Sequence, residues 1–195
     1  MGELSQKHYV NGEWKPSQGE EFASENPATG EIIWTGNSAD NNTVNEAVKA
    51  AKEAFNSWRV LSVDERNAFV DKFIDQVKSR EKDLAQEIHI ETGKPLWESK
   101  TEINSMIGKA AISVNAYSDR TGSAEKEANN VSIKLAHRPI GVFAVLGPYN
   151  FPGHLPNGHI IPALLAGNTI VFKPSELTPK FGELMVQCWA DAEIP

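Results

Sequence analysis

The sequence predicts an α/β protein that contains the beginning of a parallel sheet. Two apolar runs, at residues 141–147 and 168–173, have the composition of strands that are covered on both faces. A helical segment over residues 156–166 lies between them, and this succession of strand, helix and strand is typical of parallel pairing. Upstream, apolar residues recur at helical spacing between residues 44 and 117. Because two parallel strands do not form a stable sheet alone, we expect an incomplete sheet.

Length, composition and charge are those of an ordinary globular protein. The 195 residues are 40% hydrophobic and 23% charged, and their apolar runs are shorter than the ~20 residues that cross a bilayer. The 26 Asp and Glu outnumber the 19 Lys and Arg, and a net charge of −7 argues against a nucleic-acid-binding surface. Cys188 is the only cysteine, so no internal disulfide can form. We therefore expect a cytoplasmic protein that binds neither membranes nor nucleic acid.

The first forty residues carry two turn signals between short strands. Asn11-Gly12 favours a two-residue hairpin, because both residues tolerate positive φ. A second turn is predicted over residues 27–30, followed by a strand over residues 31–35.

Four helices are predicted after these turns. Asp40 is a candidate cap for the first, and Ser62 and Glu65 have the spacing of a capping box at the start of the second. The third covers residues 81–92 and ends at Gly93. The fourth is indicated by an apolar stripe of Ile103, Met106, Ile107, Ala110, Val114 and Tyr117. We interpret these stripes as core-packing faces.

The segment after the fourth helix divides the chain. Residues 121–130 are polar and are predicted to form a loop, whereas residues 131–137 alternate as a half-exposed strand does. We therefore divide the chain into residues 1–120, which carry the hairpins and helices, residues 121–139, which carry this strand, and residues 140–195, which carry the strand–helix–strand–helix unit.

The carboxyl ends of the two apolar strands are the expected place for a ligand, as in other open α/β sheets. The second strand ends in Lys173-Pro174-Ser175-Glu176, which brings an ammonium and a carboxylate to one strand end. A carboxylate there can accept both hydroxyls of an adenine ribose and repels a 2′-phosphate, which favours NAD over NADP. No G-x-G-x-x-G turn or P-loop occurs. The alternative is an exposed ion pair that contributes under ~1 kcal/mol.

The first strand ends in the stretch LGPYNFPG, in which two prolines enclose Asn150. An amide held rigidly at a strand end can donate a hydrogen bond to a developing oxyanion. The alternative is a turn asparagine that bonds its own backbone.

Cysteine and histidine give no independent site. Cys188 follows Phe181, Leu184 and Met185 at helical spacing, so we interpret it as a core residue rather than a nucleophile. The five histidines show no metal-ligand spacing with cysteine or carboxylate, so no metal is expected.

Four motifs of the second half occur together in a fixed order with matching gaps: P-x-G-V, P-[WY]-N-F-P, P-A-L-x-x-G-N and K-P-S-E-x-T-P. The stretches ETGKP at residues 91–95 and NPATGE at residues 26–31 fit the same pattern. In this respect the chain, from Tyr9 onwards, resembles the aldehyde dehydrogenase family.

The resemblance implies the N-terminal part of the aldehyde dehydrogenase fold, with a Rossmann-like parallel sheet, NAD as cofactor and a small aldehyde as substrate. Asn150 matches the amide that stabilises the oxyanion when a cysteine thiolate attacks the aldehyde. Residues 1–120 and 140–195 would then belong to the NAD-binding domain, and residues 121–139 to an arm of a homo-oligomer, a dimer or larger. The residues expected to bind the cofactor are Leu146, Gly147, Pro148, Tyr149, Lys173, Ser175 and Glu176.

Within the family, GPYNFPGHLPNGHIIPALLAGN is most similar to the members that oxidise N-succinylglutamate 5-semialdehyde to N-succinylglutamate in arginine catabolism. His154 and His159 are candidates for contacting the carboxylates of such a substrate. The family's catalytic cysteine and general-base glutamate match nothing in these 195 residues, so we expect an N-terminal portion that is inactive alone. Two alternatives stay open: a non-catalytic binding or assembly module, and an aldehyde dehydrogenase of a different substrate class.

Overall fold

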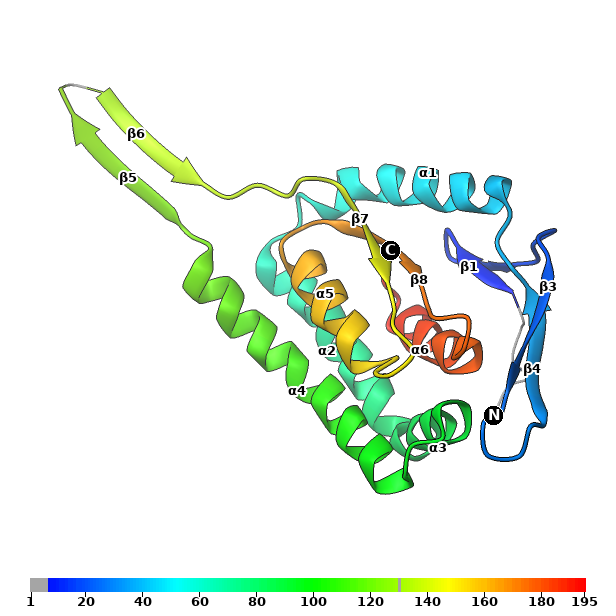
Figure 1. The fold of residues 1–195 in the computed structure, drawn as a ribbon. Helices are drawn as coiled ribbons and strands as arrows, with labels where there is room; N and C mark the ends of the chain where they lie inside the picture. The colour runs from blue at the N-terminus through cyan, green and yellow to red at the C-terminus, as the bar shows by residue number, and fades with distance from the viewer. Residues whose placement is uncertain (1–6, 130) are drawn as a thin grey trace.

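The computed structural model describes residues 7–129 and 131–195. Residues 1–6 of the predicted first segment and residue 130, the last of the predicted loop, lie outside the described residues. The described residues form two small N-terminal strand pairs, six helices and one parallel strand pair, and a two-stranded hairpin projects from this body (Figure 1). In the described part of the chain, no helix is long and apolar enough to cross a membrane.

The N-terminal strands form two antiparallel pairs. Asn11 and Gly12 have φ of 54° and 79°, so the turn predicted at these residues is confirmed. The second pair is closed by the predicted turn over residues 27–30, where Gly30 has a φ of 73°. The strands are β1 (His8–Val10), β2 (Glu13–Lys15), β3 (Glu21–Glu25) and β4 (Ile32–Asn37).

The four predicted helices are α1 (Asn41–Trp58), α2 (Val63–Ser79), α3 (Glu81–Thr92) and α4 (Leu96–Arg120). Asp40 accepts a hydrogen bond from the backbone N–H of Thr43 at 2.7 Å, which confirms it as the cap of α1. Ser62 and Glu65 form both bonds of a capping box at α2. Gly93 ends α3 in the left-handed region, with a φ of 73°.

The projecting hairpin corrects two expectations. Residues 123–128 are not a loop but the strand β5 (Ser123–Ala128), which pairs antiparallel with β6 (Val131–Ala136). Its sequence, SAEKEA, has little strand propensity, so pairing with β6 rather than local preference makes it extended. The prediction of a half-exposed β6 is also wrong, because all six of its residues are exposed. The hairpin extends away from the body, so neither of its faces is covered there (Figure 1).

The C-terminal unit consists of β7 (Val142–Leu146), α5 (His154–Leu165), β8 (Thr169–Lys173) and α6 (Pro179–Asp191). The strands β7 and β8 pair in parallel, as predicted. The expectation that β7 is covered on both faces is wrong: Val145 is buried, but Ala144 and Leu146, on the other face, are exposed. Helices α1 and α5 pack against this pair. Thr169, which pairs with Val142 and so shares the face of Ala144 and Leu146, donates from Oγ1 to the carbonyl of Ala51 in α1 at 2.8 Å, so α1 covers part of that face.

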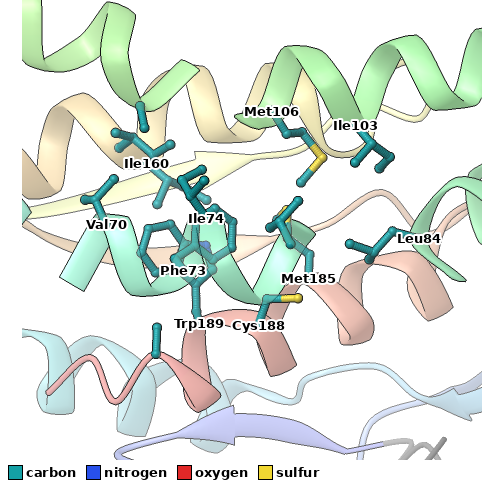
Figure 2. Packing of buried hydrophobic residues seen from close by; sticks show 14 of the residues in the cluster. Val70, Phe73, Ile74, Leu84, Ile103, Met106, Ile160, Met185, Cys188 and Trp189 are labelled. Carbon is teal, nitrogen blue, oxygen red and sulfur yellow. The ribbon is translucent and has the colours of Figure 1, made fainter. Parts of the chain in front are cut away.

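The core lies among α2, α3, α4, α5 and α6 (Figure 2). Phe73 of α2 stacks on Trp189 of α6, with ring centroids 3.7 Å apart. Cys188 is fully buried, which confirms its predicted place on the apolar face of α6. Two buried donors tie α5 to the earlier helices: Trp58 Nε1 donates to the carbonyl of Leu164 at 3.0 Å, and Arg66 Nε donates to that of Leu165 at 2.9 Å. This core fixes where α5 begins, and therefore where the turn before it lies.

Candidate active site

Parallel pairing brings the two predicted strand ends to one edge of the sheet. Leu146 pairs with Lys173 at the last position of the register, and the N–H of Gly147 donates to the carbonyl of Lys173 at 2.8 Å. The segments 147–153 and 174–178 therefore leave the sheet side by side. The structure thus groups residues that the sequence separates by more than twenty positions.

Asn150 lies in the bend between β7 and α5 and is exposed. Among the described residues, its side chain makes no hydrogen bond, so the alternative of a turn asparagine that bonds its own backbone is not seen here. The neighbouring Tyr149 and Leu146 are 44% and 74% exposed. The amide of Asn150 is therefore available to a group outside the described chain, at the rim of an apolar surface.

The turn that carries Asn150 is anchored to helix α4 by residues that were not predicted to belong to the site. The buried Glu102 of α4 accepts hydrogen bonds at Oε1 from the N–H groups of Gly153, at 2.9 Å, and His154, at 3.2 Å. Its other oxygen, Oε2, lies 2.9 Å from Nζ of Lys94. That ammonium also lies 3.8 Å from the ring centroid of Phe151. The only sequence signal was the motif ETGKP, which contains Lys94.

Two glycines in this turn pack closely against the body: a side chain at Gly153 has no room, and one at Gly147 would be tightly placed. A Cβ at Gly147 would lie 3.1 Å from the ring of Phe172, and one at Gly153 would overlap the thioether of Met106 and the ring of Phe181. These close approaches seat both ends of the turn on the body of the protein. Asn150, between them, stays on the surface.

The second strand end presents an ion pair. Lys173 and Glu176 are 2.8 Å apart and both are exposed. The hydrogen bond from Lys173 holds the pKa of the Glu176 carboxyl below its usual value, so this carboxylate is ionised at neutral pH. Ser175, by contrast, is buried, and its Oγ accepts a hydrogen bond from the N–H of Leu177 at 3.2 Å. In this chain Ser175 therefore shapes the loop rather than facing outward.

A second buried glutamate supports this loop and was also missed. Glu91 of α3 accepts hydrogen bonds from the N–H groups of Lys180, at 3.0 Å, and Phe181, at 2.8 Å, in the first turn of α6. Burial raises the pKa of Glu91 to about 8, and the nearby Glu87 adds to the rise. Glu91 therefore plays at α6 the role that Glu102 plays at α5.

The two histidines of α5, His154 and His159, lie in different environments. His154 is half-buried, and burial together with the charge of Lys109 lowers its pKa, so it is neutral at pH 7. His159 is exposed. Among residues 7–129 and 131–195, no three His, Cys, Asp or Glu are placed to hold a metal ion.

Two surface hollows lie elsewhere. One, of about 500 Å³, is lined by Trp58, Phe69 and Pro195 among others. The second, of about 380 Å³, lies between α2 and α4. Neither includes a predicted site residue.

Comparison with models of known protein families shows to which family the chain belongs. The model of the family described as "Aldehyde dehydrogenase family" matches residues 14–195, which is nearly the whole chain. This chain belongs to the aldehyde dehydrogenase family. The resemblance that the motifs indicated is thereby confirmed at the level of the family, which is a family of oxidoreductases.

Solved structures of other aldehyde dehydrogenases match along the chain. An aldehyde dehydrogenase from Bartonella henselae is 30% identical with a TM-score of 0.90, over 97% of this chain and 40% of that one. A betaine aldehyde dehydrogenase variant from Staphylococcus aureus, in complex with NAD+, is 27% identical with a TM-score of 0.91, over 99% of this chain and 40% of that one. An NADP-dependent glyceraldehyde-3-phosphate dehydrogenase from Bacillus halodurans C-125, complexed with NADP, is 27% identical with a TM-score of 0.89, over 95% of this chain and 40% of that one.

These matches confirm the predicted fold, an α/β chain that corresponds to the N-terminal part of the aldehyde dehydrogenase fold. The chain spans about 40% of the length of the solved structures that it matches. Two of these relatives were crystallised with a nicotinamide dinucleotide, which supports NAD as the cofactor at the level of the family.

Proposed function

We propose that this aldehyde dehydrogenase chain is the N-terminal portion of an NAD-dependent enzyme that oxidises N-succinylglutamate 5-semialdehyde to N-succinylglutamate in arginine catabolism. The observation that carries the proposal is Asn150: an exposed amide, free of hydrogen bonds among the described residues, on a turn anchored to the core at the carboxyl end of β7. We assign it the role of oxyanion donor.

The role follows from where charge develops. When a thiolate adds to an aldehyde, the carbonyl oxygen becomes an anion, and a preorganised N–H donor stabilises that anion more than it stabilises the neutral carbonyl. Asn150 Nδ2 supplies such a donor. Cys188 is not the thiolate, because it is fully buried and burial raises the pKa of its thiol. Residues 1–195 therefore contribute the oxyanion donor and not the nucleophile.

The residues at the second strand end fit a nicotinamide dinucleotide. The ionised Glu176 can accept hydrogen bonds from two ribose hydroxyls, and the Lys173 ammonium can donate to the same sugar. The exposed Leu146 and Tyr149 offer apolar surface beside them, with Gly147 and Pro148 forming the backbone between. NAD supplies the oxidising capacity when it is bound, and these residues orient it. Ser175 would act through the conformation of the loop.

Support for the substrate comes from the motif resemblance of residues 147–168 to the enzymes for succinylglutamate semialdehyde. That substrate carries two carboxylates, so donors at the mouth of the site are expected. His154 is neutral at pH 7 and would act as a hydrogen-bond donor rather than a cation. The end of the half-buried Lys109 side chain on α4 lies close to Gly158 of α5, the residue before the exposed His159.

The oxyanion role is tested by Asn150→Ala in the enzyme of full family length that contains this chain. We expect kcat to fall by ~10²–10³, the usual loss for one oxyanion donor, with an unchanged unfolding midpoint because the side chain is exposed. Asn115→Ala, an exposed asparagine on α4, is the matched control and should retain kcat. An unchanged kcat in Asn150→Ala would refute the role.

The substrate is tested by comparing kcat/KM over a panel of semialdehydes with and without carboxylates. We expect N-succinylglutamate 5-semialdehyde to give the highest value. A higher value for an uncharged or cationic aldehyde would favour a different substrate class, and no oxidation of any aldehyde would favour a binding or assembly module.

A further inference from the structure

We propose that Lys94 and Glu102 form a positioning pair for Asn150. The pair links helix α4 to Phe151, the residue that follows Asn150, and to the N–H groups of Gly153 and His154 at the start of α5. This inference rests on the oxyanion role proposed above. Both side chains are largely shielded from solvent, so the pair would act through the orientation of the turn rather than on a substrate itself.

Glu102 holds the far end of the turn. The residue is buried, and Oε1 accepts hydrogen bonds from the N–H groups of both Gly153 and His154, at 2.9 and 3.2 Å. Amides at the start of a helix have no partner within the helix, and a carboxylate is their strongest acceptor. A single oxygen thus fixes the direction in which the chain enters α5, three residues after Asn150.

Lys94 holds the residue next to Asn150. Its ammonium lies 2.9 Å from Glu102 Oε2 and 3.8 Å from the centroid of the Phe151 ring. A cation over an aromatic face within about 6 Å is attracted to it, more strongly when both are shielded from water. The side chains of Lys94 and Glu102 are 14% and 1% exposed. One cation therefore ties the carboxylate to the ring that directly follows the donor.

This arrangement is better explained by positioning than by stability. The desolvation free energy of two buried charges often exceeds the free energy of their attraction, so a buried ion pair adds little to the stability of a fold. The pair instead orients the turn, because its hydrogen bonds to Gly153 and His154 and its contact with the Phe151 ring together restrict the conformation of the residues after Asn150. A misplacement of about 1 Å in a reacting group can lower the rate ~10²-fold, so even a small displacement of the Asn150 amide would lower kcat.

The test uses the enzyme of full family length with the double substitution Lys94→Met and Glu102→Gln. It removes both charges together, so no unpaired charge is buried; methionine keeps the stem against Phe151, and glutamine keeps an acceptor for Gly153. The matched control is Lys78→Met with Asp75→Asn, an exposed ion pair of 3.2 Å on α2. We expect kcat to fall by ~10- to 10²-fold while KM for aldehyde and for NAD changes by less than about 3-fold. The control should keep the kcat of the unmodified enzyme.

The decisive measurement repeats the double substitution in the Asn150→Ala background. Residues that act through one another are non-additive, so the double substitution should then lower kcat by less than about 2-fold. The same loss in both backgrounds, or an unchanged kcat in the first, would overturn the positioning role. If Asn150→Ala alone leaves kcat unchanged, it is the oxyanion assignment that fails.

A second variant and a second measurement distinguish a positioning effect from a folding defect. Glu102→Asp keeps the charge pair but draws the carboxylate back by one methylene, and we expect a kcat-specific loss from it as well. Hydrogen exchange of the Gly153 and His154 amides should be faster in both variants. Wild-type kcat together with wild-type exchange in a folded Glu102→Asp enzyme would count against the proposal.

Discussion

In the proposed cofactor site, Glu176 would carry one charge at the ribose 2′ position, where NAD and NADP differ. Its carboxylate is ionised and exposed, and such a group accepts ribose hydroxyls but repels a 2′-phosphate. The relatives include enzymes crystallised with NAD+ and with NADP, so the family alone does not decide between them.

We expect Glu176→Gln in the full-length enzyme to raise the ratio of kcat/KM for NADP to that for NAD, because the repulsion is removed while one acceptor remains. The control is Glu53→Gln, which removes an exposed glutamate of another ion pair, with Lys49 on α1. Steady-state kinetics with both cofactors measure the ratio. Identical ratios in the unmodified enzyme and in Glu176→Gln would remove the ribose contact from the proposal.

Glu91 makes stability depend on pH. Its pKa is about 8 in the folded protein and near its ordinary value of 4.5 when unfolded, so between these values the folded state holds one more proton. The free energy of unfolding should therefore fall as pH rises from about 4.5 to 8, by up to about 1.4 kcal/mol per pH unit from this group. Denaturant titrations at several pH values measure it. Glu91→Gln should flatten this part of the profile, and parallel profiles would contradict the assignment.

At the scale of elements, the helix boundaries follow from local chemistry. Asp40, Ser62 and Gly93 were predicted to begin or end helices, and each does so through its own short-range hydrogen bonds or backbone angle. The hairpin of β5 and β6 could not be predicted in the same way. The β5 half has little strand propensity, so its extended form depends on pairing with β6, to which the exposed Glu125–Lys134 ion pair of 2.7 Å adds under ~1 kcal/mol.

The exposed hairpin presents Val131, Ile133 and Leu135 on one face of β6. Members of this family assemble into oligomers, and we propose that this face packs against a second copy of the chain. Ile133→Lys should then lower the molar mass of the assembled protein, measured by light scattering or sedimentation, because a charge would be buried in the contact. Ser132→Lys places the same charge on the opposite face and is the matched control. An unchanged mass in Ile133→Lys would exclude this face.

At the scale of the whole molecule, one helical core sets the geometry of the candidate site. The helices α2, α4 and α6 bury Phe73, Met106 and Met185, and α5 rests on them (Figure 2). Both strand ends then lie where α5 and α6 begin, each held by a buried carboxylate from a neighbouring helix. The site is thus positioned by long-range packing, although its outward-facing residues lie in two short segments.

The sequence by itself determined the α/β class, the helix caps, the parallel strand pair and the family, because periodicity, capping residues and motif order are local properties of the chain. It also marked Asn150, Lys173 and Glu176 as candidates. Only the tertiary structure decided what supports them. Glu102 looks like an ordinary helix-face acid in the sequence, and Glu91 is marked only as the first residue of the ETGKP motif; nothing local shows that they bind amides 51 and 90 residues away. Burial and long-range pairing depend on which elements meet, and this is decided by the packing of the whole chain.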